Sequence, residues 1–143
     1  MSLFHLLSVS SSGMSAQRIR AEALVENLAN VETTRKADGD LYRRKDVTFS
    51  AEHQGSPFSR YLTDASAPSG VSASEYEESS RPGEKRFAPG HPDADKDGYI
   101  TLPNINVAEE MVDLLSAARG HQANAAAMST VKDMIQKSLE LFR

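Results

Sequence analysis

A run of alternating acidic residues is the part of this sequence that comes nearest to a chemical site. Asp93, Asp95 and Asp97 precede Gly98, as in the first half of an EF-hand calcium loop. Oxygen ligands at alternate residues can surround a cation, but the twelfth position is Asn104, where the loop needs a bidentate Glu. Two interpretations follow: a small calcium-binding module, and, favoured by the missing ligand, an Asx turn that leads into a strand.

The remaining chemistry-bearing residues are scattered. No pair of the four histidines has ligand spacing, and the chain has no cysteine. The sequence also lacks a Gly-x-Ser-x-Gly elbow and a glycine-rich phosphate loop. A helical-bundle enzyme is a third interpretation, which the absence of inward Glu/His pairs disfavours. We therefore expect no enzyme activity, no metal and no cofactor.

Composition limits the classes of partner. The chain has 143 residues, enough for one domain, with 39% hydrophobic residues and a mean hydropathy of -0.46. Its net charge of -4 and pI of about 5.5 argue against binding to nucleic acid or anionic lipid. No run of about 20 apolar residues is present, and residues 1–8 lack the basic start of a cleaved signal peptide. We expect no membrane insertion.

Both ends of the chain carry apolar residues at helical spacing. Over residues 3–31, Leu7, Met14, Ala21 and Leu28 recur every seven positions, which predicts one apolar face. Gly13 interrupts this predicted helix. Because glycine weakens a helix interior but gives room for a neighbour, it indicates either a bend or the close approach of a second helix.

A second helix is predicted over residues 107–142. Asn106 is a good N-cap, Glu109 completes a capping box, and Glu110 adds negative charge at the positive helix end. The apolar stripe of this helix follows 4-3 spacing through Met111, Leu114, Ala118, His121, Ala125, Met128, Ile135, Leu139 and Phe142.

The region between the helices is polar and rich in turn residues. Residues 41–49 and 99–102 are predicted strands, and the composition of residues 55–85 is typical of a long flexible loop. Short strands within or next to that loop are possible only around Tyr61, Val71, Tyr76 and Phe87.

The predicted fold is mainly α with a small β-containing middle, its two terminal helices packing as a coiled-coil-like pair. It divides into residues 1–34, 35–103 and 104–143. Apolar stripes at both ends suit a head-to-tail contact between copies. When such a contact does not close into a ring, its repetition builds a helical filament. The candidate assembly residues are Leu7, Met14, Leu24, Leu28, Val31, Met111, Leu114, Ala118, Met128, Ile135 and Leu139.

Several motifs make the sequence recognisable. They are residues 12–20 and 26–34, residues 42–49 and 90–106, and the shorter runs 109–113 and 122–124. Together they resemble the flagellar axial proteins, which include rod, hook and hook-associated proteins, and most of all the rod subunits of the basal body. The shared motif at the end of the first helix contains Ala29, Asn30, Thr33 and Thr34. Asn30 fits both a family contact and an ordinary C-cap, since Asn tolerates a left-handed backbone.

This resemblance implies a structural protein of the proximal rod, which is part of the drive shaft for motility. The terminal helices of many subunits would pack into a tube, with the middle segment outside. The implied partners are other copies, neighbouring proximal and distal rod subunits and an adaptor at the rod base. The implied location is the rod of the basal body, which crosses the periplasm, after export without a cleaved signal peptide.

Overall fold

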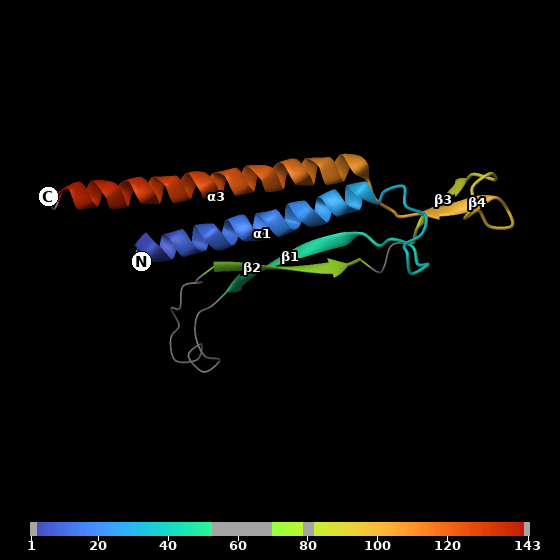
Figure 1. The fold of residues 1–143 in the computed structure, drawn as a ribbon, viewed down its shortest axis with the longest axis horizontal. Coiled ribbons are helices and arrows are strands. Elements are labelled where there is room, and N and C mark those ends of the chain that lie inside the picture. The colour runs from blue at the N-terminus through green and yellow to red at the C-terminus, as the bar shows by residue number, and fades with distance from the viewer. Residues whose placement is uncertain (1–2, 53–69, 79–81, 142–143) are drawn as a thin grey trace, which may run out of the picture.

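The computed structural model describes residues 3–52, 70–78 and 82–141 as an elongated molecule built around two long helices (Figure 1). Helix α1 spans Leu3–Ala29 and helix α3 spans Val107–Leu141. The two helices lie antiparallel, so the start of α1 and the end of α3 lie at the same end of the molecule (Figure 1). Both predicted helices are confirmed, although α1 ends two residues early and leaves Val31 in the following turn.

A two-stranded hairpin packs along α1. Strand β1, Lys45–Glu52, pairs antiparallel with β2, Gly70–Glu77, and every residue of one strand has a partner in the other. The hairpin contacts α1 on the side away from α3 (Figure 1). At the start of β2, the Val71 N–H donates a 3.0 Å hydrogen bond to Ser12 Oγ of α1. Helix α1 therefore lies between α3 and the β1–β2 hairpin.

A second, shorter hairpin extends beyond the helices, at the end of the molecule far from both chain termini (Figure 1). Strand β3, Glu84–Phe87, pairs antiparallel with β4, Tyr99–Leu102. Phe87 and Tyr99 are opposite partners whose rings meet edge to face, with centroids 5.3 Å apart. Such aromatic pairs stabilise a small sheet that has little other core.

The predicted strands were partly right. Strand β4 matches the prediction for residues 99–102, but β1 begins at Lys45 rather than at residue 41. The loop interpretation of residues 55–85 is wrong for β2 and for the first two residues of β3. Val71 and Tyr76 lie in β2 and Phe87 ends β3, whereas Tyr61 and Phe142 lie outside the described residues.

The start of α3 is capped as predicted. Asn106 Oδ1 accepts a 3.1 Å hydrogen bond from the Ala108 N–H, which would otherwise have no partner within the helix. Asn106 therefore fixes where α3 begins.

The buried core of the described residues is thin, and three of its seven residues are alanines. It consists of Ala16, Ala23, Leu24, Tyr42, Ile100, Ala117 and Val131. Small residues between helices let the two backbones approach closely, but they bury little apolar area. Among the described residues, neither helix combines the length and apolar character needed to cross a membrane.

Candidate functional site

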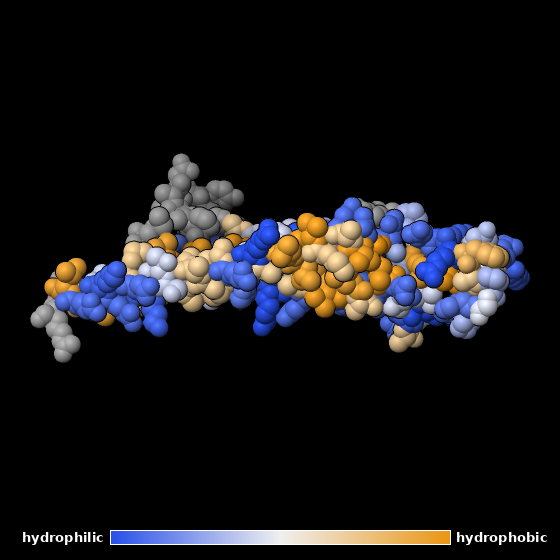
Figure 2. Space-filling view, turned by 90° about the horizontal axis from the view of Figure 1, so that it is seen from above, coloured by the Kyte–Doolittle hydropathy of each residue, from blue (hydrophilic) through white to orange (hydrophobic). Residues whose placement is uncertain are grey.

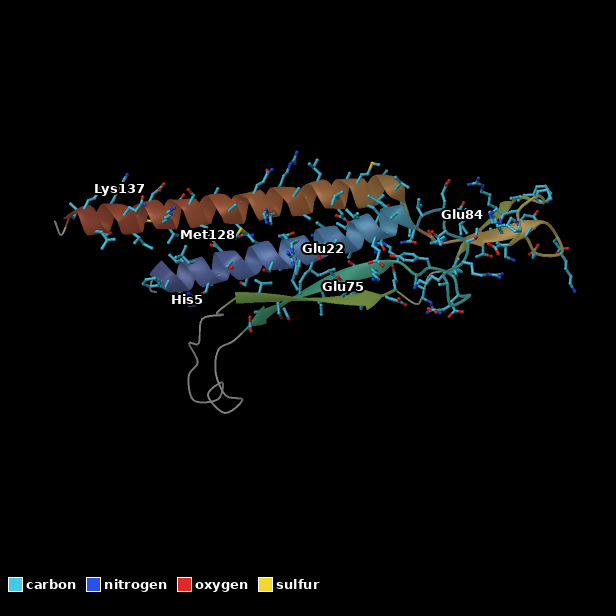
Figure 3. All side chains as sticks on the ribbon, viewed as in Figure 1. His5, Glu22, Glu75, Glu84, Met128 and Lys137 are labelled. Carbon is cyan, nitrogen blue, oxygen red and sulfur yellow. The ribbon has the colours of Figure 1, made fainter. Side chains whose placement is uncertain are left out.

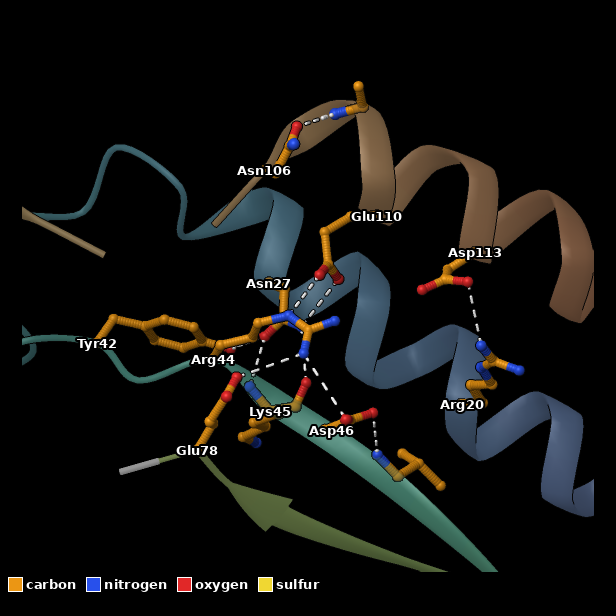
Figure 4. A network of polar contacts seen from close by, with 12 residues as sticks. Arg20, Asn27, Tyr42, Arg44, Lys45, Asp46, Glu78, Asn106, Glu110 and Asp113 are labelled. Atoms are coloured by element: carbon orange, nitrogen blue, oxygen red, sulfur yellow. Dashed lines mark hydrogen bonds and ion pairs between the residues drawn. The ribbon is translucent and has the colours of Figure 1, made fainter. Parts of the chain in front are cut away.

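The junction of α1, β1 and α3 is held by one fully buried amide. Asn27 Nδ2 donates to the Lys45 carbonyl at 2.8 Å and to Glu110 Oε2 at 3.0 Å. Asn27 Oδ1 accepts from the Tyr42 hydroxyl at 3.1 Å and from the Lys45 N–H at 2.9 Å. Asn27 is 0% exposed, and all four of its hydrogen-bonding positions are used (Figure 4). The amide therefore ties together three elements that are distant in sequence.

Glu110 is the buried charge of this junction, at 1% exposure. Arg44 Nε donates a 2.6 Å hydrogen bond to Glu110 Oε1, and Arg44 Nη1 lies 3.7 Å from Asp46 and 3.5 Å from Glu78 (Figure 4). A buried carboxylate is tolerated only when it is paired and hydrogen-bonded. We call Asn27, Tyr42, Arg44, Lys45 and Glu110 the polar junction.

The ionisable groups of the polar junction are biased toward the forms that hold it together. Burial, assisted by the charges of Glu26, Glu77 and other carboxylates, raises the pKa of Tyr42 to about 12. Burial lowers the pKa of Arg44, but the hydrogen bond and charge of Glu110 outweigh it, so the pKa is raised. Tyr42 therefore stays a neutral donor and Arg44 stays a cation over the physiological range.

Beyond the polar junction, α1 and α3 meet along a seam of small and polar residues. A Cβ placed on Gly13 would lie 3.0 Å from Asn124 Nδ2, and one placed on Gly120 would lie 3.0 Å from Gln17 Cδ. Of the alternatives that the sequence left open at Gly13, the close approach of a second helix is therefore confirmed. Arg20 Nη2 also pairs with Asp113 Oδ1 at 3.2 Å.

The outward face of α3 is apolar near its start. Met111, Val112 and Leu115 are 58%, 68% and 53% exposed, and Val107 is also exposed. Figure 2 shows the resulting hydrophobic patch over the first turns of α3. We call these four residues the outer patch. Opposite them, Glu110 and Ala117 of the same helix are buried against the rest of the chain.

The structure separates the predicted assembly residues into three groups. Leu24 is buried. Leu7, Met14, Leu28, Val31, Leu114, Met128 and Ile135 are half-buried, and Met128 lies on the side of α3 that faces α1 (Figure 3). Met111, Ala118 and Leu139 are exposed, as are His121 and Ala125 of the same predicted stripe. The predicted stripe of α3 therefore coincides only in part with the face that α3 packs against α1.

The turn after α1 is held by side chains. Asn30 Nδ2 donates to the Glu26 carbonyl at 2.9 Å, and Thr33 Oγ1 donates to Asn30 Oδ1 at 3.1 Å. Asn30 therefore caps the end of α1 through its side chain. Its backbone is not left-handed, because no residue other than glycine has positive φ in the described part of the chain. Ala29 is exposed at the helix end.

The acidic run is a turn that is tied to the end of α1. Asp95 Oδ1 accepts hydrogen bonds from the Asp97 and Tyr99 N–H groups at 3.0 and 2.9 Å, which is an Asx arrangement. Asp93 accepts a 2.7 Å hydrogen bond from Thr34 Oγ1. Two of the three carboxylates are thus engaged within the protein, which favours the turn over the calcium loop. No metal-holding group of three His, Cys, Asp or Glu side chains occurs among the described residues.

The polar junction was not predicted from the sequence. Glu110 was assigned to the helix dipole, but its side chain is buried and reaches Arg44 and Asn27. The available signal was that Asn27, Arg44 and Glu110 stand in three of the motifs quoted above.

The C-terminal part of the chain shows the class of protein to which it belongs. Residues 96–141 match the family model of the C-terminal segment of flagellar basal body rod FlgEFG proteins. This segment contains β4 and α3, and with them Glu110 and the outer patch.

Full-length relatives give the particular family. The flagellar basal-body rod protein FlgC of Borreliella burgdorferi is 36% identical over 100% of this chain and 99% of its own length. FlgC of Bacillus subtilis is 39% identical over 99% of both chains, and FlgC of Aquifex aeolicus is 36% identical over 100% of this chain. The chain belongs to the FlgC family of flagellar basal-body rod proteins. It is a structural subunit and not an enzyme.

Proposed function

We propose that this subunit polymerises through the outward faces of its two terminal helices to form part of the proximal rod. The observation that supports this proposal is the outer patch on α3. Its large apolar side chains stay exposed although the opposite face of the same helix is already packed. A helix that is packed on one face and still exposes large apolar side chains on the opposite face is typical of one with a neighbour on each side.

The helix that covers the outer patch would come from another copy of the subunit. Ala118 and Leu139, which are also exposed predicted assembly residues, would add apolar surface farther along α3. On α1, Val25 is 52% exposed and could take part in the same packing. Repetition of such a contact without closure gives a helical tube, in which the helices would pack in a coiled-coil-like manner.

The partners and location follow from this assembly. We propose contacts with other copies, with neighbouring proximal and distal rod subunits and with an adaptor at the rod base. The three-part division at residues 34 and 103 would then place helices inside the tube and the middle segment outside it. We further propose that the rod containing this subunit crosses the periplasm and that export uses no cleaved signal peptide.

The outer patch can be tested with a charge placed at its centre. Val112→Asp puts a carboxylate on an exposed apolar position, so we expect the isolated chain to keep its helix content and stability but to fail to enter the rod. The matched control is Gln122→Asp, a charge at an exposed polar position of the same helix.

The readouts are circular dichroism of each purified variant, swimming motility and mass spectrometry of purified hook–basal bodies. Normal incorporation of the Val112→Asp chain would contradict the proposal. Equal loss of both variants from basal bodies would also contradict it, because the effect would then not depend on the outer patch.

A further inference from the structure

The seam between α1 and α3 holds the two helices together but does little to select one alignment. Away from the polar junction it contains small residues, such as Gly13, Ala16, Ala117 and Gly120. Its ion pair between Arg20 and Asp113 is 31% and 39% exposed, and exposed pairs of this kind contribute little. Side chains that interdigitate select a register because large residues need matching spaces. A seam of small residues has few large side chains that must be matched, so its packing selects a register only weakly.

A slip of one heptad would keep much of this surface compatible. Shifting α3 by seven residues in one direction would move Gln17 from Gly120 to Ala127 and would place Asn27 beside Ala117, so both new neighbours are small. The shift would move α3 along α1 by about 10 Å. Packing alone therefore penalises the slipped pair weakly.

The polar junction, by contrast, can form in only one alignment. Asn27 uses both donors and both acceptors, and one of its partners is Glu110 of α3. Arg44 bonds to the same carboxylate at 2.6 Å. In the slipped pair Glu110 would move away from both, leaving a buried amide donor and a partly buried guanidinium without their main partner.

We propose that Asn27, Arg44 and Glu110 are register-determining residues, which select one alignment of α1 and α3. A buried polar contact can specify register in this way even where it adds little to stability. The inference deepens the proposed function, because the register also sets where the outer patch lies relative to the β1–β2 hairpin. The alignment itself is a property of the isolated chain.

The absence of cysteine makes the alignment directly measurable. Gln17→Cys with Gly120→Cys places two thiols at a contact of the observed register. Gln17→Cys with Ala127→Cys places them together only after a one-heptad slip, since a disulfide needs Cα atoms within about 7 Å. Each pair is oxidised in the purified full-length chain, and the cross-linked fraction is measured by mass spectrometry.

Two changes to the polar junction are compared in both cysteine backgrounds. Glu110→Ala removes the shared carboxylate. Arg44→Met with Glu110→Met replaces the ion pair by apolar side chains of similar length, a change that proteins often tolerate without loss of stability. Glu109→Ala is the matched control, since it removes an exposed carboxylate from the neighbouring position.

With the unmodified junction, and also in the Glu109→Ala control, we expect Gln17→Cys to cross-link with Gly120→Cys and not with Ala127→Cys. In the Met double variant, the ratio of native to slipped cross-link should fall about tenfold or more, with helix content retained. Native cross-linking alone in the folded double variant would overturn the proposal. So would unfolding of the double variant, because the junction would then serve stability rather than alignment.

This test and the test of the outer patch can fail separately. The cross-linking experiment uses the isolated chain and involves no assembly. Loss of register in the variants together with normal incorporation of Val112→Asp would support the register role and contradict the assembly surface. Retained register in the variants together with failed incorporation of Val112→Asp would contradict the register role and support the assembly surface.

Discussion

Asn27 is the residue on which the arrangement of the elements depends most. Its side chain bonds to α3, to the segment before β1 and to the first residue of β1. Removing an amide with several buried partners leaves each of them unsatisfied.

The first prediction is that Asn27→Ala lowers the free energy of unfolding by about 2–4 kcal/mol. Urea denaturation followed by circular dichroism measures this change. Asn30→Ala is the control, because Asn30 caps the end of α1 through hydrogen bonds at the surface and should cost about 1 kcal/mol or less. Equal losses in the two variants would contradict the importance given to the buried amide.

Tyr42 should make the stability depend on alkaline pH. Its pKa is raised in the folded state to about 12, from an ordinary value of 10.0, so the folded protein holds this proton more tightly than the unfolded chain. The resulting stabilisation is complete below about pH 10 and is lost as the pH rises toward about 12.

We therefore expect Tyr42→Phe to be less stable than the unmodified chain near neutral pH and to lose less stability on going from about pH 8 to about pH 11. Urea midpoints at the two pH values give the comparison. The account of Tyr42 is wrong if the alkaline loss is the same with and without its hydroxyl.

At this scale the sequence predicted local contacts and missed distant ones. Asn106 was predicted as an N-cap because the pattern lies within four residues, and the cap is present. Glu110 was misassigned because its partners Arg44 and Asn27 are 66 and 83 positions away. Composition and periodicity carry no information about which distant polar groups meet.

At the scale of elements, the two helices follow from their spacing and caps. The 35-residue length of α3 exceeds the usual helix of about 10–14 residues, and its start is fixed by Asn106. Asn106→Ala should therefore fray the first turn and lower the free energy of unfolding by about 1 kcal/mol.

Hydrogen exchange of the first turn of α3, together with urea denaturation, measures this effect. Asn104→Ala changes a nearby exposed residue that does not cap the helix and should have little effect. Unchanged exchange at Ala108 in the Asn106→Ala variant would show that the cap does not hold the helix start.

The strands were less predictable than the helices. Strand β2 reads Gly-Val-Ser-Ala-Ser-Glu-Tyr-Glu, a composition that on its own is more typical of a loop. It forms a strand because β1 supplies a partner for each residue and Ser12 of α1 anchors its start. Strand formation here depends on tertiary contacts that propensity does not describe.

At the scale of the whole molecule, apolar surface remains after the chain has packed its own core. Large apolar residues at both ends of the helix pair are exposed, among them Phe4, Val112 and Leu141. The sequence predicted that the ends would serve assembly, and placed the stripe residues by spacing alone. Spacing could not say which face α3 would turn toward α1, because both of its faces carry apolar residues.

The central claim is that the outer patch is covered by another subunit in the assembled rod. Cryo-electron microscopy of hook–basal bodies purified from the source bacterium measures this directly at side-chain resolution. We expect Met111, Val112 and Leu115 to lie within about 4–4.5 Å of a helix from a neighbouring rod subunit. A rod in which this face of α3 is open to solvent, with the subunits joined elsewhere, would contradict it.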